Sequence, residues 1–339
     1  EGLRVFALDD AENWREVQVV RGLDNPSFLA FDQNHRFLYV VHGDFSEVSS
    51  FRISRHDGSL SFLSRQSTGG RNPVHLAVDS TNRFLVVANF ATGSLALFPL
   101  AEDGSLDERC DLVALPGEPG PHRKEQKGSH PHQILFDPMS RRFLAPDKGV
   151  DRIFVGRIDT KRGKIEIDGS LTIVAREGAA PRHGVFHPAK PFVYVANELD
   201  STVSTYGYDA ETGRLRPVEI ISTLPPDCLV TSHAAGIAIT PDGRYVFVSN
   251  RGHDSVSTFM VDDTASTLTR VATTSARGRK PRFITLDPSG RRLLVANEDD
   301  DSILTFAIES GGQLRVLGNP VSTGSPVCVV FAAQSSTEV

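Results

Sequence analysis

One strand–turn–strand pattern recurs along this chain at a fixed register. In its clearest copy, an apolar segment starts at Pro181 and ends at Phe186, a turn follows at Pro188, and a second segment runs from Phe192 to Asn197. Further copies open at Pro26, Pro73, Pro131, Ala234, Pro281 and Pro326. Repeats of about 45–60 residues made of short strands are typical of β-propellers and solenoids. The sequence therefore predicts an all-β chain that folds as a seven-bladed β-propeller.

Each copy is expected to supply one four-stranded antiparallel blade. In the copy that opens at Pro281, the first two strands are the apolar runs 283–286 and 293–296. Both runs lack a polar face, as expected of strands that neighbouring blades cover on both sides. The third strand, residues 302–306, alternates apolar and polar side chains and is expected nearer the rim. A turn at residues 311–312 then leads to the outer strand.

The two ends of the chain are expected to build the remaining blade together. Residues 3–8 are predicted as its third strand, residues 17–20 as its fourth, and residues 326–331 as a strand from the C-terminal segment. A blade shared by the N- and C-terminal segments closes the ring and removes free sheet edges. No segment is identified as its second strand. Residues 1–339 are thus predicted to form a single propeller domain.

Charge and composition narrow the classes of function. A net charge of −6 and a pI near 6.0 give no electrostatic basis for binding nucleic acid or an anionic membrane. No apolar run approaches the ~20 residues that span a bilayer. The three cysteines lie far apart without metal-ligand spacing, which indicates free thiols in a reducing compartment. These features predict a cytoplasmic protein; secretion stays open because the chain begins at Glu1 without a methionine.

The register also sorts side chains by face. The first strand of a copy leaves one face of the ring and the second strand returns to it, so the start of one and the end of the other lie together. First strands line the channel of a propeller, and these positions are therefore expected around its mouth. They carry His132, Lys148, Arg182, Glu198, Arg251, Arg282 and Glu298. One position further along the first strand adds His75 and His183.

This set of side chains favours a site for a small anionic ligand. Four basic groups alternate with two carboxylates and a histidine, and solvated surface ion pairs are the alternative interpretation. The loop of residues 117–129 enters from the same face and carries Arg123. It is the longest loop on that face and is expected to act as a lid.

Other polar residues of the repeat are interpreted as structural. The residues that end the second strands are expected to bond the nearby backbone of their loops; they are Asn89, Asp147, Asn197, Asn250 and Asn297. The acidic run at residues 299–301 lacks further ligands at metal-binding spacing and is interpreted as a solvated turn. The sequence therefore predicts no metal site.

The segments at the channel mouth resemble one known family. They read Ser129-His130-Pro131-His132, Pro146-Asp147-Lys148-Gly149, Pro181-Arg182-His183, Asn197-Glu198-Leu199, Ser249-Asn250-Arg251-Gly252 and Pro281-Arg282-Phe283. Together they are similar to the lactonase family of seven-bladed propellers, and the similarity runs from Leu23 to Phe331. That family includes bacterial-type 6-phosphogluconolactonases and fungal carboxymuconate lactonising enzymes.

The resemblance implies roles for individual residues. The residues proposed for catalysis in the carboxymuconate enzymes correspond here to His132, Arg182, Glu198 and Arg251. The residues expected to bind substrate are Lys148, His183, Arg282, Glu298, Arg123 and His75. Two positions depart from the family pattern. Lys124 follows Arg123 where Gln is usual, and Glu298 replaces a frequent Gln and adds negative charge to the site.

Three hypotheses of function fit these residues. The sequence favours hydrolysis of a sugar lactone such as 6-phosphogluconolactone, without a metal or other cofactor. Glu198 or His132 then serves as the general base. Arg182 or Arg251 stabilises the oxyanion. The first alternative is a carboxymuconate cycloisomerase, in which His132 is favoured as the acid because nearby arginines oppose the raised pKa that a protonating Glu198 needs. The second is a non-catalytic propeller that binds protein partners, although Trp-Asp pairs are missing from its strand ends.

Overall fold

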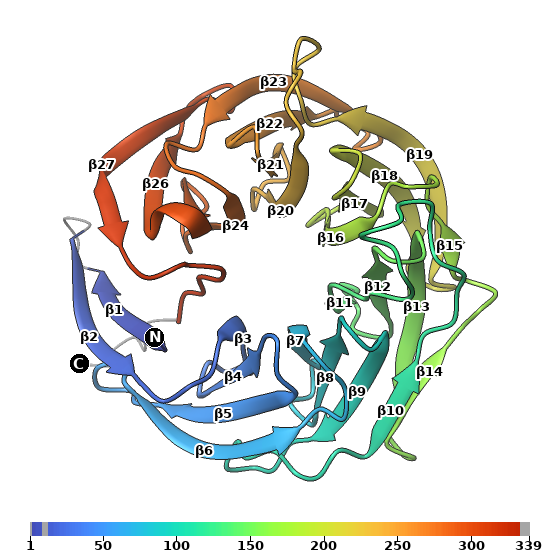
Figure 1. Ribbon diagram of the computed structural model, residues 1–339, viewed down its shortest axis with the longest axis vertical. Helices are drawn as coiled ribbons and strands as arrows, with labels where there is room; N and C mark the ends of the chain where they lie inside the picture. Colours follow the sequence, from blue (N-terminus) through green and yellow to red (C-terminus); the bar gives the residue numbers. More distant parts are fainter. Residues whose placement is uncertain (1, 9–12, 333–339) are drawn as a thin grey trace. The chain divides into compact units, whose positions relative to one another are not determined.

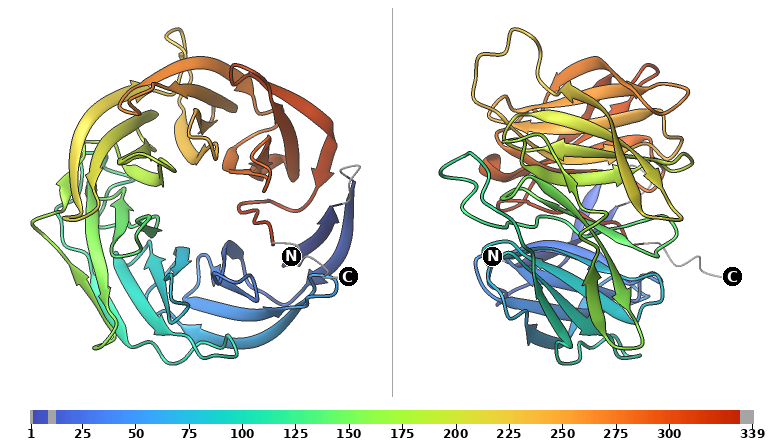
Figure 2. Two further views of the ribbon diagram at one scale, coloured as in Figure 1. Left: turned by 180° about the vertical axis from the view of Figure 1, so that it is seen from behind. Right: turned by 90° about the vertical axis from the view of Figure 1, so that its right-hand side faces the viewer.

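The structure is a computed structural model that describes residues 2–8 and 13–332. Apart from one short 3-10 turn, η1 (Glu298–Asp300), the elements of these residues are β-strands, as predicted. The chain divides into two compact units. The first unit comprises Glu1–Pro116, Ile158–Glu166 and Val330–Val339, and the second comprises Gly117–Arg157 and Ile167–Val329. Figure 1 labels the strands, and Figure 2 shows them from two further sides.

The sheets of the first unit are antiparallel. A two-stranded sheet pairs β1 (Leu3–Leu8) with β2 (Trp14–Val20). The strands of one four-stranded sheet are β3 (Pro26–Phe31), β4 (Phe37–His42), β5 (Glu47–Ile53) and β6 (Leu60–Ser67). Those of the next are β7 (Pro73–Val78), β8 (Phe84–Asn89), β9 (Ser94–Pro99) and β10 (Asp111–Ala114). Within each sheet, strands that are neighbours in the chain are hydrogen-bonded neighbours.

The second unit repeats this plan. Its first sheet, part of which belongs to the first unit, consists of β11 (Leu135–Phe136), β12 (Phe143–Asp147), β13 (Arg152–Asp159), β14 (Lys164–Ile167) and β15 (Ile173–Val174). Three four-stranded sheets follow. They consist of β16 (Pro181–Phe186), β17 (Phe192–Asn197), β18 (Thr202–Asp209) and β19 (Arg214–Ser222); β20 (His233–Ile239), β21 (Tyr245–Arg251), β22 (Ser255–Val261) and β23 (Leu268–Ser275); and β24 (Pro281–Leu286), β25 (Arg292–Asn297), β26 (Ser302–Ile308) and β27 (Leu314–Ser322).

The predicted four-stranded antiparallel blade is confirmed for five sheets. The sheet that begins at β11 differs because the short strand β15 also pairs with β13. Its first strand is only two residues long, and Pro131 joins the sheet through an isolated bridge to Asp147. The predicted register holds here and elsewhere, since Pro181 lies opposite Asn197 and Pro281 lies opposite Asn297.

A side-chain bond closes the turn between the first two strands of a sheet. The Oδ1 atom of Asp79 accepts the backbone N–H groups of Arg83 and Phe84 at 2.8 and 2.7 Å. Asp287 accepts those of Arg291 and Arg292 at 3.0 and 2.9 Å in the same way. Asp is favoured at this position because its carboxylate replaces the hydrogen bonds that the reversed backbone cannot make.

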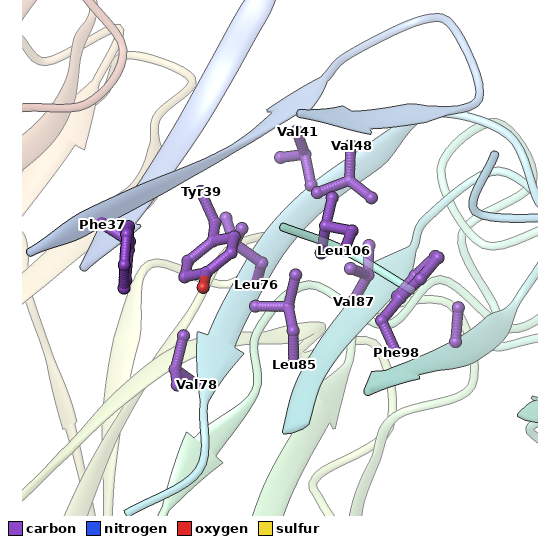
Figure 3. Packing of buried hydrophobic residues seen from close by; sticks show 11 residues of the cluster. Phe37, Tyr39, Val41, Val48, Leu76, Val78, Leu85, Val87, Phe98 and Leu106 are labelled. Atoms are coloured by element: carbon purple, nitrogen blue, oxygen red, sulfur yellow. The ribbon is translucent and has the colours of Figure 1, made fainter. Parts of the chain in front are cut away.

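The apolar core lies between successive sheets of each unit. In the first unit, Tyr39 of β4 packs in one cluster with Leu85 of β8 and Phe98 of β9, and each is at most 1% exposed (Figure 3). In the second unit, Phe247 and Phe306 fill the equivalent space between the last two sheets. Both faces of the inner strands are therefore covered, which explains why those strands read as unbroken apolar runs.

The C-terminal segment differs from its prediction. Residues 326–331 form no strand, and the sheet of β1 and β2 has two strands where three were predicted. The start of the segment is nevertheless bonded like the start of another copy of the repeat. The N–H of Ser325, which precedes Pro326, donates to Asp301 at 2.7 Å. In the same way, the N–H of Lys280, which precedes Pro281, donates to Asp254 at 2.8 Å.

Candidate functional site

A β-bulge directs the side chain that follows the opening proline of a copy. The ladder skips one residue between Pro181 and His183, and again between Pro281 and Phe283. Arg182 and Arg282 are the skipped residues. A bulged residue leaves the regular alternation of the strand, so its side chain is re-aimed. The bulge explains why Arg182 reaches Glu198, which follows the opposite strand at its end.

Glu198 is bound by three cations from three different sheets. Its Oε1 atom lies 2.7 Å from Nζ of Lys148. Its Oε2 atom lies 2.9 Å from Nε of Arg182 and 3.1 Å from Nη2 of Arg251. The side chains of Glu198, Arg182 and Lys148 are at most 9% exposed, and that of Arg251 is 13% exposed. Water therefore screens these ion pairs much less than it screens surface pairs.

These cations fix the protonation state of Glu198. Burial alone would raise the pKa of this carboxyl group. The charges of Arg251, Lys148 and Arg182 outweigh burial and hold the pKa well below its usual range. Glu198 is thus a carboxylate at neutral pH, and a carboxylate with so low a pKa is a weak base.

Backbone carbonyl groups anchor the two arginines. Nη1 of Arg182 donates to the carbonyl oxygen of Ala235 at 2.9 Å, and Nη2 of Arg251 donates to that of Ala234 at 3.3 Å. Both acceptors lie in β20. Burial lowers the pKa of Arg182, as does the charge of Arg251, while Glu198 opposes this shift. The guanidinium keeps its charge at neutral pH because its pKa starts above about 12.

Two buried histidines, His132 and His183, contact each other. Nδ1 of His132 lies 3.2 Å from Nε2 of His183, and the two rings meet edge to face. Burial lowers the pKa of His132 well below its usual value, and the charges of Arg182, Arg282 and Lys148 act in the same direction. His132 is therefore a neutral imidazole at pH 7, which can accept a proton but is a poor acid there.

A second carboxylate repeats this arrangement at the equivalent positions of another sheet. The Oε2 atom of Glu298 lies 3.1 Å from Nζ of Lys280 and 3.7 Å from Nη1 of Arg282. Arg282 and Glu298 occupy the same places in the repeat as Arg182 and Glu198. The second group is more open, since the side chains of Glu298 and Arg282 are 19% and 30% exposed.

The loop of residues 117–129 is bonded to the segment that carries Lys148. Nε2 of Gln126 donates to the carbonyl oxygen of Lys148 and to Asp151, both at 2.8 Å. Glu125 places a carboxylate 3.3 Å from Nζ of Lys148. A Cβ atom on Gly149 would lie 1.8 Å from the carbonyl oxygen of Gly128, so only glycine fits there. These contacts show an anchored loop, and its predicted role as a lid stays a prediction.

The structure brings together most of the side chains that the sequence placed at the channel mouth. Direct contacts join Lys148, Arg182, Glu198 and Arg251, and another contact joins His132 to His183. Arg123 is an exposed residue of the anchored loop. His75 belongs to the first unit, where its ring centre lies 4.2 Å from that of Phe28 with the two rings tilted by 35°.

Sequence reasoning missed three contributors, Lys280, Glu125 and Gln126. Lys280 had a signal, because it precedes the opening Pro281 and its carbonyl group accepts the N–H of Glu298 at 3.0 Å. The position before the opening proline could therefore have been counted among the repeat positions whose side chains lie at the site. Gln126 had none, since its bonds to Lys148 and Asp151 depend on the path of an irregular loop.

The predicted backbone bonds of the residues that end the second strands are confirmed for Asp147, which accepts the N–H of Gly149 at 2.9 Å, and for Asn297, which donates to the carbonyl oxygen of Ala276 at 3.2 Å. Two asparagines have further partners. Asn197 donates to the hydroxyl groups of Thr202 and Ser204, both at 2.9 Å, rather than only to loop backbone. Asn250 bonds the hydroxyl of Ser257 at 3.2 Å as well as the carbonyl oxygen of Thr223. The hydroxyl partners lie on the next strand, so each amide ties two strands together where they end.

The described part of the chain lacks both a cluster of metal ligands and a membrane-spanning helix. No group of three or more His, Cys, Asp or Glu side chains there is arranged to hold a metal ion. In the acidic run after Asn297, Asp300 instead bonds the backbone and side chain of Arg279, and Asp301 bonds Ser325. None of the helices in the described residues is long and apolar enough to cross a bilayer.

Comparison with known proteins identifies relatives along the whole chain. The model of a family described as "Lactonase, 7-bladed beta-propeller" matches residues 1–331. The 6-phosphogluconolactonase of Bacillus subtilis is 33% identical over 338 residues, which is 98% of this chain and 95% of that protein. The 6-phosphogluconolactonase of Cronobacter sakazakii is 32% identical over 267 residues, or 78% of this chain and 75% of that protein.

A solved structure agrees with these relatives. The periplasmic gluconolactonase of Pseudomonas aeruginosa superposes with a TM-score of 0.91 at 28% identity, and the match covers 99% of this chain and 96% of that one. The predicted enzyme, a carboxylic-ester hydrolase, is confirmed by relatives that are lactone hydrolases. The chain belongs to the lactonase family of β-propellers, as its motifs predicted.

Proposed function

We propose that this protein hydrolyses a sugar lactone, in the manner of its 6-phosphogluconolactonase relatives, and that the Glu198 cluster is its catalytic centre. The observation that carries the proposal is the buried carboxylate held by Lys148, Arg182 and Arg251. Three cations fixed around one carboxylate, beside a neutral imidazole, form a preorganised field for an oxygen that becomes negative during the reaction.

The proposed reaction begins with attack of water on the lactone carbonyl carbon. His132 accepts a proton from that water, and Arg182 and Arg251 stabilise the tetrahedral oxyanion. Collapse of this intermediate breaks the bond between the carbonyl carbon and the ring oxygen. The ring oxygen takes the proton back from His132, which leaves an open-chain sugar acid and regenerates the imidazole.

Glu198 acts in this proposal by holding the cations in place. Three cations hold its pKa low and engage both of its oxygen atoms, whereas His132 is a neutral imidazole, so the proposal takes His132 as the base. The same neutral imidazole disfavours a cycloisomerase, which needs an acid to protonate carbon. Lys148, His183, Arg282, Glu298 and Arg123, which all belong to the second unit, are retained as substrate-binding residues. The steps use side chains alone, and we expect dialysis against EDTA to leave the rate unchanged.

The same proposal includes seven blades in one domain. The two-stranded sheet of β1 and β2 is then the incomplete seventh blade, which the C-terminal segment joins to close the ring. Its support is that Val330 and Val5 both pack against the apolar cluster that contains Leu3.

The test of the catalytic centre is lactone hydrolysis followed by pH-stat with purified variants. Arg182→Ala and Glu198→Ala are each expected to lose about 10²-fold or more in kcat. Arg182→Lys keeps the charge but loses the geometry of the guanidinium, and it serves if the alanine variants fold poorly. Arg176→Ala is the matched control, since Arg176 is exposed and pairs only with Asp200 among the contacts described. Unchanged turnover in the folded Arg182 and Glu198 variants would sink the proposed centre.

A further inference from the structure

The second carboxylate group offers a test of which lactones the site accepts. Glu298, Lys280 and Arg282 come together at positions of the repeat that correspond to the Glu198 group. Ala180 precedes Pro181 where Lys280 precedes Pro281, so the second group has one cation more at this place. It also lies nearer to solvent, since the Lys280 side chain is 37% exposed. These differences make it suited to contact the distal part of a substrate rather than its reacting carbonyl.

Arg282 links the two groups electrostatically. Its charge lowers the pKa of both His132 and Arg182, so it lies within electrostatic range of the proposed catalytic centre. Arg282 and Lys280 are also more exposed than Arg182 and Lys148. A lactone whose carbonyl meets Arg182 would therefore direct its far end toward these outer cations.

The outer cations are already neutralised by carboxylates of this chain. Glu298 pairs with both, and Asp299 lies 3.4 Å from Nζ of Lys280. A phosphate at this place would gain two cations but would meet two carboxylates. A hydroxyl group meets no such repulsion, because it can donate to a carboxylate and accept from a guanidinium.

We propose that Glu298 is a specificity-determining residue that selects sugar lactones with an uncharged distal hydroxyl group over their phosphorylated counterparts. This inference rests on the proposed lactonase function. Glu298 would act by occupying Arg282 and Lys280 and by repelling a dianion, since juxtaposed like charges discriminate strongly between partners.

The first test compares glucono-δ-lactone with its 6-phosphate as substrates. We expect the parent protein to hydrolyse glucono-δ-lactone with the higher kcat/KM. Glu298→Gln keeps the size of the side chain and removes its charge, so the ratio of kcat/KM for the phosphorylated over the plain lactone should rise about tenfold or more. An unchanged ratio would overturn the inference while leaving the lactonase proposal intact.

A binding measurement separates this inference from failure of the lactonase proposal. Calorimetry gives the affinities of gluconate and 6-phosphogluconate, the hydrolysis products, without requiring turnover. Glu298→Gln should tighten 6-phosphogluconate about tenfold or more and leave gluconate nearly unchanged. Equal shifts for both ligands, or none, would overturn the inference even if no lactone is hydrolysed.

Asp299→Asn is the matched control. It removes one negative charge from the adjacent residue, whose side chain is 50% exposed and contacts Lys280 but not Arg282. We expect its effect on both ratios to be small, because solvent screens an exposed charge. A shift as large as that of Glu298→Gln would mean that net charge, rather than Glu298 itself, sets the preference.

Discussion

At the scale of single residues, environment decides which group can move a proton. Glu198 and His132 were equal candidates for the general base in the sequence, where only residue type and register are visible. The structure surrounds Glu198 with Lys148, Arg182 and Arg251, and it buries His132 against His183. Cations stabilise the carboxylate and burial disfavours the imidazolium, so both groups are unprotonated at neutral pH for opposite reasons.

The pH dependence of hydrolysis tests the assignment of His132. Its lowered pKa keeps the imidazole deprotonated at a pH where free histidine, with a pKa of about 6.5, becomes charged. We therefore expect kcat/KM to stay level from pH 8 down to about pH 6 and to fall only at lower pH. His132→Asn should reduce the rate about 10²–10⁴-fold, and the remaining kcat/KM should no longer fall at low pH.

The exposed His56 provides the control for this profile. His56→Asn should keep both the rate and the acid limb of the parent. An acid limb centred at the value of a free histidine, or one that survives in His132→Asn, would contradict the assignment.

At the scale of elements, the strand register was predictable because it depends on local patterns. The third strand predicted at residues 302–306 begins at the observed residue, Ser302. Apolar runs, a Pro or Asp at the turn and an Asn at the strand end define the hairpin without reference to distant residues. The sheet that begins at β11 was harder to predict, since its short β11 and additional β15 depend on how irregular segments pack.

One copy of the repeat has a histidine where others have asparagine. Nε2 of His42 lies 2.8 Å from the hydroxyl of Ser49, as the amide of Asn197 lies 2.9 Å from that of Ser204. A Ser–His contact can suggest a nucleophile, but His42 and Ser49 are both fully buried and occupy the structural frame of the asparagines. We interpret this pair as a tie between two strands.

His42→Asn tests that interpretation through acid stability. Burial lowers the pKa of His42, so the folded state disfavours its protonation. Its stabilising effect is full above the unfolded pKa of about 6.5 and is lost as the pH falls through the lower folded value. Asn does not titrate, and the variant should lose less stability than the parent between pH 7.5 and pH 5 in urea unfolding. If His42→Asn and the parent showed the same pH dependence, or if the variant were much less stable at pH 7.5, this interpretation of the His42–Ser49 pair would be wrong.

At the scale of the whole molecule, the two ends of the chain decide whether the first sheet is stable. The sheet of β1 and β2 has two strands, and an isolated two-stranded sheet is marginal in water. Val330 and Val20 both pack against the cluster that contains Leu3, so the C-terminal segment shares an apolar core with this sheet. Trp14 lies in β2 and is the only tryptophan of the chain, which makes it a reporter of the sheet.

Val330→Asp should destabilise the protein, because a charge replaces an apolar side chain against that cluster. We expect a loss of about 1–3 kcal/mol in urea unfolding, with coincident transitions by Trp14 fluorescence and far-UV circular dichroism. Val174→Asp is the control, since Val174 is 62% exposed. Separate transitions by the two probes would show that the sheet of β1 and β2 unfolds alone, contrary to a single domain.

The sequence by itself determined the repeated hairpin, its register and the family, because these depend on the order of apolar, turn and charged residues along the chain. It also placed Arg182 and Glu198 at facing strand ends, since the pairing of Pro181 with Asn197 follows from the pattern. Only the tertiary structure decided which charges touch. The three cations on Glu198 come from three sheets, and the pairing of Glu298 with Arg282 and Lys280 depends on a bulge and a loop. Electrostatic interaction varies with distance and burial, and neither quantity is encoded in the linear pattern.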